Sequence, residues 1–267
     1  MVDVFAESYE PETAARLTAY EHPLSERMRT FLRLELLHRQ AEFHARDATE
    51  FGTRAAVTSL LEMLTVASRG DVRADVLKEL DRHVARLQHY RRTPGVDESR
   101  LTTVLGRLDS LRETLSAAGK QFLSGLRDNE FLSTILHRSA IPGGTCMFDL
   151  PEYGYWLQMP AADRLRELRT WLSLFKPLND AINEVLWLTR ESSSSQSLVA
   201  PNGFYQHSLS RKDTMQLVRV LLPHSGGLFP RVSAGPHRFT VYFMEWVDGE
   251  TRTQQTLNDV GFELALC

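Results

Sequence analysis

Apolar residues recur every three or four positions through the first half of the chain, which is the spacing of helices with one buried face. The dipeptide His22-Pro23 predicts an extended entry, after which Pro23 occupies the first turn of a helix. Asp71 and Asp97 are predicted N-caps of two later helices. We therefore predict helices from residue 20 to about residue 140. The apolar stripe of the first helix is Leu24, Met28, Phe31, Leu32 and Leu36.

The pattern changes at Ile141, where Gly143 and Gly144 mark a turn. Aromatic and apolar residues with glycine and proline between them follow from Cys146 to Met159, and we interpret residues 141–160 as strands. Helical spacing returns from Ala161 to Thr189. Because proline has no backbone N–H, Pro177 is expected to break or kink that helix.

Period-two alternation predicts strands near the C-terminus. In the middle run, Phe239 and Phe243 fall on one face of the strand, and Thr240 and Tyr242 fall on the other. The paired turn residues between the runs indicate antiparallel neighbours. The three predicted strands are Gln216–Leu222, Arg238–Val247 and Val260–Leu266.

Segregation of helices from strands favours the α+β class over a regular alternation of the two. We predict an N-terminal helical domain plus a C-terminal antiparallel β domain with a helical insertion between its strands. The first nineteen residues, 1–19, are interpreted as a variable N-terminal extension. The helical domain is predicted at 20–140, joined by helices from 161–192. The β-strand domain is predicted to consist of 141–160 and 196–267.

Composition narrows the function classes. Hydrophobic residues make up 42% of the 267 residues and charged residues 24%, as in ordinary globular proteins. A net charge of −3 argues against general nucleic-acid binding, which usually needs a basic footprint. The sequence has no secretory leader pattern and no apolar run of about 20 residues that could span a bilayer. With two cysteines, Cys146 and Cys267, the expected location is the cytoplasm.

Motifs of known site chemistry are missing from the sequence. No two histidines lie three or four residues apart, and neither a glycine-rich phosphate loop nor a Gly-x-Ser-x-Gly elbow occurs. We therefore expect no metal, nucleotide or organic cofactor. Cys146 is interpreted as a buried thiol, and His38 with Glu42 as a surface contact. Because catalytic groups can assemble from distant residues, a small-ligand enzyme with a site between the helical and β domains stays as the alternative.

Arginines are the better candidates for a binding site, because the guanidinium fork binds carboxylates bidentately. Arg29 and Arg33 lie four residues apart, so both project from one side of the first helix. An ordinary helix with solvated arginines, with Arg29 paired to Glu26, is the competing interpretation. The complete candidate set is Arg29, Arg33, Arg69, Arg73, Arg127, Arg138, Arg231 and Arg238.

Short segments spread along the chain resemble the ZapD family of FtsZ-associated cell division proteins. The longest is HPLSERMRTFLRLE at 22–35, which is the most specific of them. The others, in the same order as in the family, are LKELDR at 77–82, PGVD at 94–97, IPGG at 141–144, FDLP at 148–151, NGFYQ at 202–206 and FELA at 262–265.

This resemblance implies a non-enzymatic homodimer that binds FtsZ, a tubulin-like GTPase polymer, and crosslinks its filaments. It also implies a cytoplasmic protein at mid-cell, promoting assembly of the Z-ring, without nucleic acid or membrane insertion. Family members are understood to hold the FtsZ C-terminal tail in a positively charged pocket, which makes the arginines above its candidate lining. Tyr242 stands where the family pattern has a basic residue, and Glu152 and Gly154 also depart from it. Arg29 and Arg33 are accordingly stronger candidates than Arg238.

Overall fold

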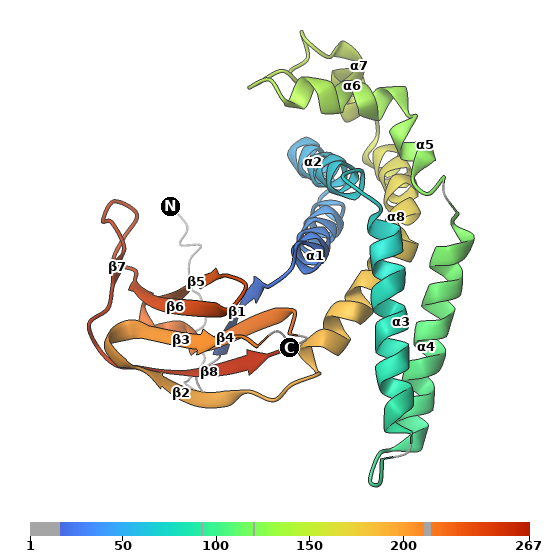
Figure 1. Cartoon of the computed structure of the whole chain (residues 1–267). Coiled ribbons are helices and arrows are strands. Elements are labelled where there is room, and N and C mark those ends of the chain that lie inside the picture. Colours follow the sequence, from blue (N-terminus) through green and yellow to red (C-terminus); the bar gives the residue numbers. More distant parts are fainter. Residues whose placement is uncertain (1–16, 92, 120, 211–214) are drawn as a thin grey trace, which may run out of the picture. The chain divides into compact units, whose positions relative to one another are not determined.

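The structure is a computed structural model that describes residues 17–91, 93–119, 121–210 and 215–267 (Figure 1). The described residues form two compact units, each considered by itself. The β unit consists of residues 17–25 and 190–267, and the helical unit consists of residues 26–189. With helices and antiparallel sheets segregated in this way, the predicted α+β class is confirmed.

Side-chain caps begin most of the long helices of the helical unit. Asp71 accepts a hydrogen bond from Ala74 N, and Asp97 accepts one from Arg100 N, so both predicted N-caps are confirmed. Thr49 caps the second helix in the same way. The helices are α1 (Glu26–His44), α2 (Glu50–Ala67), α3 (Val72–Tyr90), α4 (Glu98–Ala117), α5 (Ser124–Arg127), α6 (Glu130–Ser139), α7 (Pro151–Gln158) and α8 (Ala161–Arg190).

The predicted start of the first helix is wrong. Pro23 ends strand β1 (Leu17–Pro23), and α1 begins only at Glu26. The extended entry that proline imposes on His22 extends into a full strand, because seven residues pair with strand β4 (Leu217–Pro223). The predicted stripe is only partly right, since Leu36 is 55% exposed. The buried positions of α1 are Met28, Phe31, Leu34, Leu37 and Ala41.

The predicted strands within residues 141–160 are also wrong, because Pro151–Gln158 forms α7. Proline at the first helical position is already set for a helix, and Tyr153 and Trp156 are buried on one face of the turn that follows. Aromatic residues favour strands only weakly, so packing decided the outcome. Cys146 lies in the preceding turns and is half-buried, with Sγ 3.7 Å from Asp149 Oδ2, so the interpretation of a buried strand thiol is wrong.

Pro177 does not divide its helix, because α8 runs for 30 residues from Ala161 to Arg190. The residues around the proline, Phe175, Leu178 and Ile182, are fully buried. Packing of this apolar face therefore offsets the lost backbone hydrogen bond, which costs about 3 kcal/mol in an isolated helix.

The β unit contains two antiparallel sheets (Figure 1). The first has the order β1-β4-β8-β2, and the second has the order β3-β6-β5 with β7 paired to β6. The predicted strands at the C-terminus are confirmed as β4, β6 and β8. The remaining bounds are β2 (Gln196–Ala200), β3 (Phe204–Ser208), β5 (Leu228–Ala234), β6 (Arg238–Glu245), β7 (Gln254–Gln255) and β8 (Val260–Leu266).

The core of the β unit is built from alternate positions of three strands. Phe239, Val241 and Phe243 of β6 are fully buried, whereas Thr240 and Tyr242 are only partly buried, which confirms the predicted alternation. These β6 residues join one apolar cluster with residues of β4 and β8 that also alternate, namely Val218, Val220, Leu222, Val260, Phe262 and Leu264. The opposite face of β6 carries Arg238, Thr240 and Tyr242, together with the buried Met244.

Candidate functional site

Three of the predicted arginines line two adjoining pockets of the helical unit, where α2 ends, α3 begins and α5 follows α4. Arg73 and Arg127 line one pocket of about 350 Å³, and Arg69 and Arg127 line a second pocket of about 350 Å³. Ser68 and Arg127 belong to both linings. We call this surface the arginine pocket and define it by Arg69, Arg73 and Arg127.

Backbone carbonyl groups hold two of these guanidinium groups. Arg73 donates from Nε to Leu115 O at 2.8 Å and from Nη2 to Ser116 O at 2.9 Å, at the end of α4. Arg127 donates from Nη2 to Phe122 O. The carbonyl groups that end a helix have no partner within it, so the donors of Arg73 satisfy those of Leu115 and Ser116, whereas Phe122 lies in the turn before α5. Both guanidinium groups are oriented by these bonds and keep further N–H donors, because each carries more donors than it uses here.

The third arginine of the pocket has no such bonds. Arg69 is exposed, and its side chain has no hydrogen bond or ion pair with any residue that the structure describes. Among the described residues that line the two pockets, the only carboxylate is that of Asp71, whose side chain caps α3 at 3.0 Å from Ala74 N. Three guanidinium groups therefore face one carboxylate, and the pocket attracts anions such as the carboxylates of an acidic peptide.

The arginine pair of α1 lies outside the arginine pocket. Arg29 Nε is 3.3 Å from Glu26 Oε1, so the predicted pairing of these two residues is confirmed. Arg33 is exposed and forms no ion pair within the described part of the chain. Only Arg33 of this pair therefore presents a charge that no neighbouring carboxylate offsets.

The remaining predicted arginines lie elsewhere. Arg138 Nη1 is 4.0 Å from Asp149 Oδ1 in the helical unit. In the β unit, Arg231 is the cross-strand partner of Tyr242, and Arg238 lies four residues before Tyr242 on the same face of β6. Phe204 completes the row across this face, with its ring centroid 5.3 Å from that of Tyr242. The two arginines thus share the outer face of the second sheet with two aromatic rings.

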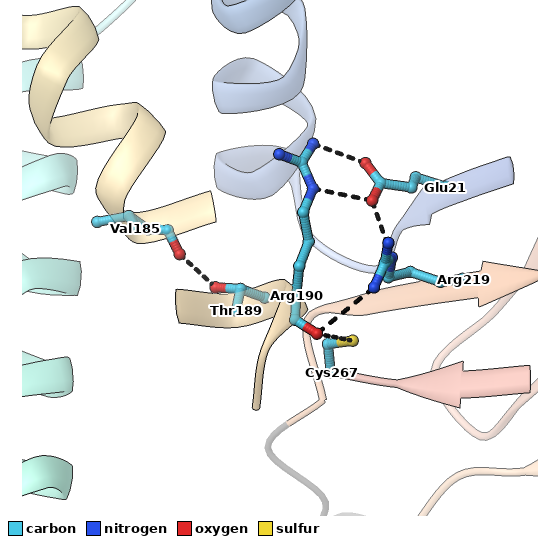
Figure 2. A network of polar contacts seen from close by, with 6 residues as sticks. All are labelled: Glu21, Val185, Thr189, Arg190, Arg219 and Cys267. Atoms are coloured by element: carbon cyan, nitrogen blue, oxygen red, sulfur yellow. Dashed lines mark hydrogen bonds and ion pairs between the residues drawn. The ribbon is translucent and has the colours of Figure 1, made fainter. Parts of the chain in front are cut away.

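Sequence reasoning missed a charge network of the β unit in which two arginines share one carboxylate (Figure 2). Glu21 accepts two hydrogen bonds from Arg190, at 2.9 and 2.8 Å, and a third from Arg219 Nε at 3.0 Å. Arg219 also donates to the backbone oxygen of Arg190 at 3.4 Å, and the buried Cys267 thiol lies 3.2 Å from Ser193 Oγ. Glu21 and Arg219 are cross-strand partners of β1 and β4, so a correct prediction of β1 would have paired them.

Titratable side chains form no metal site in the regions that the structure describes, since no three of the His, Cys, Asp and Glu residues there converge on one point. His38 Nε2 is 3.7 Å from Glu42 Oε1, and burial lowers the pKa of His38 despite that neighbour. None of the helices within the described ranges is both long and apolar enough to cross a membrane.

Comparison with known proteins gives a consistent picture. A family model described as ZapD, cell division protein, matches residues 32–242, which is more than half of the chain. The chain is 37% identical over 248 residues to the cell division protein ZapD of Methylococcus capsulatus, covering 93% of this chain and 97% of that protein. It is 34% identical over 254 residues to the protein of the same name from Coxiella burnetii, covering 95% of this chain and 98% of that protein.

Proposed function

We propose that this chain, which belongs to the ZapD family of cell division proteins, binds FtsZ filaments and crosslinks them without catalysing a reaction. The proposal includes a homodimer in the cytoplasm that acts at mid-cell with the division ring and stabilises it. The segment bound is the C-terminal tail of FtsZ, as the family resemblance implies. The arginine pocket is the observation that carries the proposal, because it gathers three cations around one carboxylate.

The chemistry of the pocket suits an acidic peptide. Arg73 and Arg127 are held by neutral carbonyl groups, so they keep their full positive charge while their orientation is fixed. Fixing the groups before binding lowers the entropy lost when the peptide docks. Arg69 adds a charge that no carboxylate among the described residues offsets, and it can turn toward a peptide carboxylate. Carboxylate recognition is therefore better supported here than at the paired arginines elsewhere.

Crosslinking requires two such sites on one particle. A two-fold dimer duplicates any site on the chain, and closed two-fold symmetry is the commonest arrangement of soluble oligomers. Once one site holds a filament, the second site meets neighbouring subunits at high effective concentration. Weak binding of single tails thereby becomes strong bundling of filaments. A dimeric mass by analytical ultracentrifugation is the expected result, and a monomer at micromolar concentration would contradict the crosslinking mechanism.

The decisive experiment follows FtsZ polymers with GTP by light scattering and by sedimentation. Arg69→Glu should lower the apparent affinity about tenfold or more, because each lost charge-assisted hydrogen bond costs about 1.5–3 kcal/mol and the new carboxylate repels the tail. The wild-type signal should also fall as salt rises, since a Debye length is about 10 Å at 0.1 M. FtsZ without its C-terminal tail should give no increase in scattering.

Arg100→Glu is the matched control for charge. Arg100 is exposed near the start of α4, about 22 Å along the helix from Leu115 at 1.5 Å per residue. Its reversal should leave bundling unchanged, and circular dichroism should show that both variants fold. If Arg69→Glu bundles FtsZ as well as the wild type does, the arginine pocket is not part of the binding site. If the protein never raises FtsZ scattering but turns over a small molecule, the enzyme alternative is right instead.

A further inference from the structure

A second concave surface of the helical unit lies between α7 and α8, beside the start of α6. It is a groove of about 540 Å³ whose described lining includes four aromatic residues. We call it the aromatic groove and define it by Phe131, Tyr155, Trp156 and Trp171, with Glu152 and Glu167 at its rim. No residue that the structure describes belongs to the linings of both this groove and the arginine pocket.

The rings of Phe131, Trp156 and Trp171 pack against one another, and Tyr155 is the exposed aromatic residue of the lining. The ring centroid of Trp156 lies 5.6 Å from those of both Phe131 and Trp171, and the planes of the two tryptophans are 29° apart. Trp156 is 5% exposed, whereas Tyr155 is 73% exposed. Glu152 and Tyr155 lie three residues apart on α7, so the carboxylate and the exposed ring share one side of the helix.

The charge at the rim is negative. Glu167 Oε2 accepts a hydrogen bond from Trp156 Nε1 at 2.8 Å, which holds the carboxylate against the ring. Glu152 is exposed and forms no ion pair with the residues that the structure describes. Arg166, the one cation among the described residues of the lining, is paired to Asp163 at 2.8 Å. Two carboxylates therefore remain without an offsetting charge beside a wall of aromatic rings.

We propose that the aromatic groove binds a cationic side chain, arginine or lysine, carried by an apolar segment of another protein. The faces of aromatic rings attract cations, and tryptophan does so most strongly. Tyr155 is exposed and Trp171 partly exposed, so these two rings can meet a cation, whereas Trp156 is stacked between Tyr153 and Trp171 and supports them from behind. The aliphatic stem of an arginine or lysine covers apolar surface while its charged end reaches the carboxylates at the rim. This surface goes beyond the proposed FtsZ function, because its charge preference is opposite to that of the arginine pocket.

The test uses the full chain labelled with 5-fluorotryptophan and a synthetic peptide, acetyl-Gly-Leu-Arg-Leu-Arg-Gly-amide. The chain has four tryptophans, so ¹⁹F spectra report on the groove through Trp156 and Trp171 while Trp187 and Trp246 serve as references. Saturable shifts confined to Trp156 and Trp171 are expected. The control peptide carries citrulline in place of arginine, which keeps the shape and removes the charge. It should bind about fivefold more weakly or worse.

Variants separate charge from shape. Glu152→Gln with Glu167→Gln should weaken the arginine peptide about five- to tenfold, while glutamine keeps the acceptor for Trp156 Nε1. Glu98→Gln, at the exposed start of α4, is the matched control and should change nothing. Equal binding of the citrulline peptide, or equal shifts of Trp246, overturns the proposal. So does a Tyr155→Ala variant whose sedimentation mass falls, because the groove would then be a contact between copies of the chain.

Discussion

In the β unit, Arg190 and Arg219 share the carboxylate of Glu21, whereas in the helical unit Arg73 and Arg127 donate to neutral backbone carbonyl groups. The first arrangement offsets charge, and the second only orients it. An arginine bonded to a carbonyl group therefore still attracts an anion, while one bonded to a carboxylate is largely committed to the fold. The number of arginines in a region says little about a binding site, and the identity of their partners says much.

The interiors of the two units also differ in the polar side chains that they bury. Among the described residues of the β unit, the buried polar side chain is that of Thr256, which does not titrate. The helical unit buries Glu79 and His83 on α3, with Glu79 bonded by Arg27 and Arg82. Long helices that pack side by side bring charged stems into contact with apolar faces, whereas the sheet faces of a sandwich exclude them. The helical unit should therefore respond to pH more strongly than the β unit.

The largest expected effect is loss of stability of the helical unit in acid, through His83. Burial, with further lowering by Arg82 and Arg86 and opposition from Glu79, reduces the pKa of His83 to about 4 from 6.5. Between those values the unfolded chain binds a proton that the folded chain does not, so stability falls as pH falls from 6.5 toward 4. The full loss is about 3 kcal/mol, since one pKa unit corresponds to about 1.4 kcal/mol.

Urea denaturation at several pH values measures this loss. His83→Leu removes the titrating group and should flatten the stability curve between pH 6.5 and 4, apart from the contribution of carboxylates at the lower end. His89→Gln, at an exposed position of the same helix, should leave the wild-type slope. An unchanged slope in His83→Leu would show that other groups cause the acid sensitivity.

A smaller effect is expected from Glu21→Gln in the β unit. The substitution keeps the shape but leaves Arg190 and Arg219, each about one-quarter exposed, without a carboxylate. We expect a loss of about 2 kcal/mol, below the 3–5 kcal/mol of a fully buried pair because water reaches these side chains. Hydrogen exchange of β1 and β4 amides gives the local stability. Glu250→Gln, an exposed carboxylate of the same unit, is the control, and an equal change in both variants contradicts the account.

The pattern of apolar and capping residues was enough to predict a helix or strand whose conformation its own residues determine. Alternation predicted β6 and β8, and the side chains of Asp71 and Asp97 predicted two helix starts. Pattern failed where a distant partner decides the conformation. Leu17–Pro23 is a strand because β4 pairs with it, and that partner lies about 200 positions along the chain. Pro151–Gln158 is a helix because its aromatic face is buried in the helical unit.

The sequence was enough to predict that arginines form the candidate site, but not which of the arginines lie together. Charge and side-chain geometry single out arginines, and Arg69 and Arg73 are close in sequence. Arg127 lies beside them only because the segment between α4 and α5 packs against the turn between α2 and α3. The spacing of apolar residues along the chain does not predict that contact. The hydrogen-bond partners of Arg73 are also distant in sequence, since Leu115 and Ser116 lie more than 40 residues from it.

The smallest expected effect on stability comes from Arg29→Glu with Arg33→Glu. Arg33 is exposed, and Arg29 lies in the first turns of α1, where a carboxylate interacts favourably with the helix dipole by about 0.3–1 kcal/mol. That gain offsets much of the lost pair with Glu26 and of the repulsion between neighbouring carboxylates, about 0.2–0.5 kcal/mol for each pair, so helicity and sedimentation mass should match the wild type and the denaturation midpoint should change little. Bundling of FtsZ should fall nevertheless if α1 belongs to the binding surface.

The single variants sharpen this prediction. Arg33→Glu should account for most of the loss, because the charge of Arg29 is already offset at 3.3 Å by Glu26. The loss should also be smaller than that of Arg69→Glu, since the arginine pocket fixes two further cations around its ligand and α1 does not. Arg39→Glu, exposed on the same helix, controls for net charge. If the double variant bundles FtsZ like the wild type, α1 does not belong to the binding surface. If it unfolds at a lower denaturant concentration, Arg29 and Arg33 stabilise the fold instead.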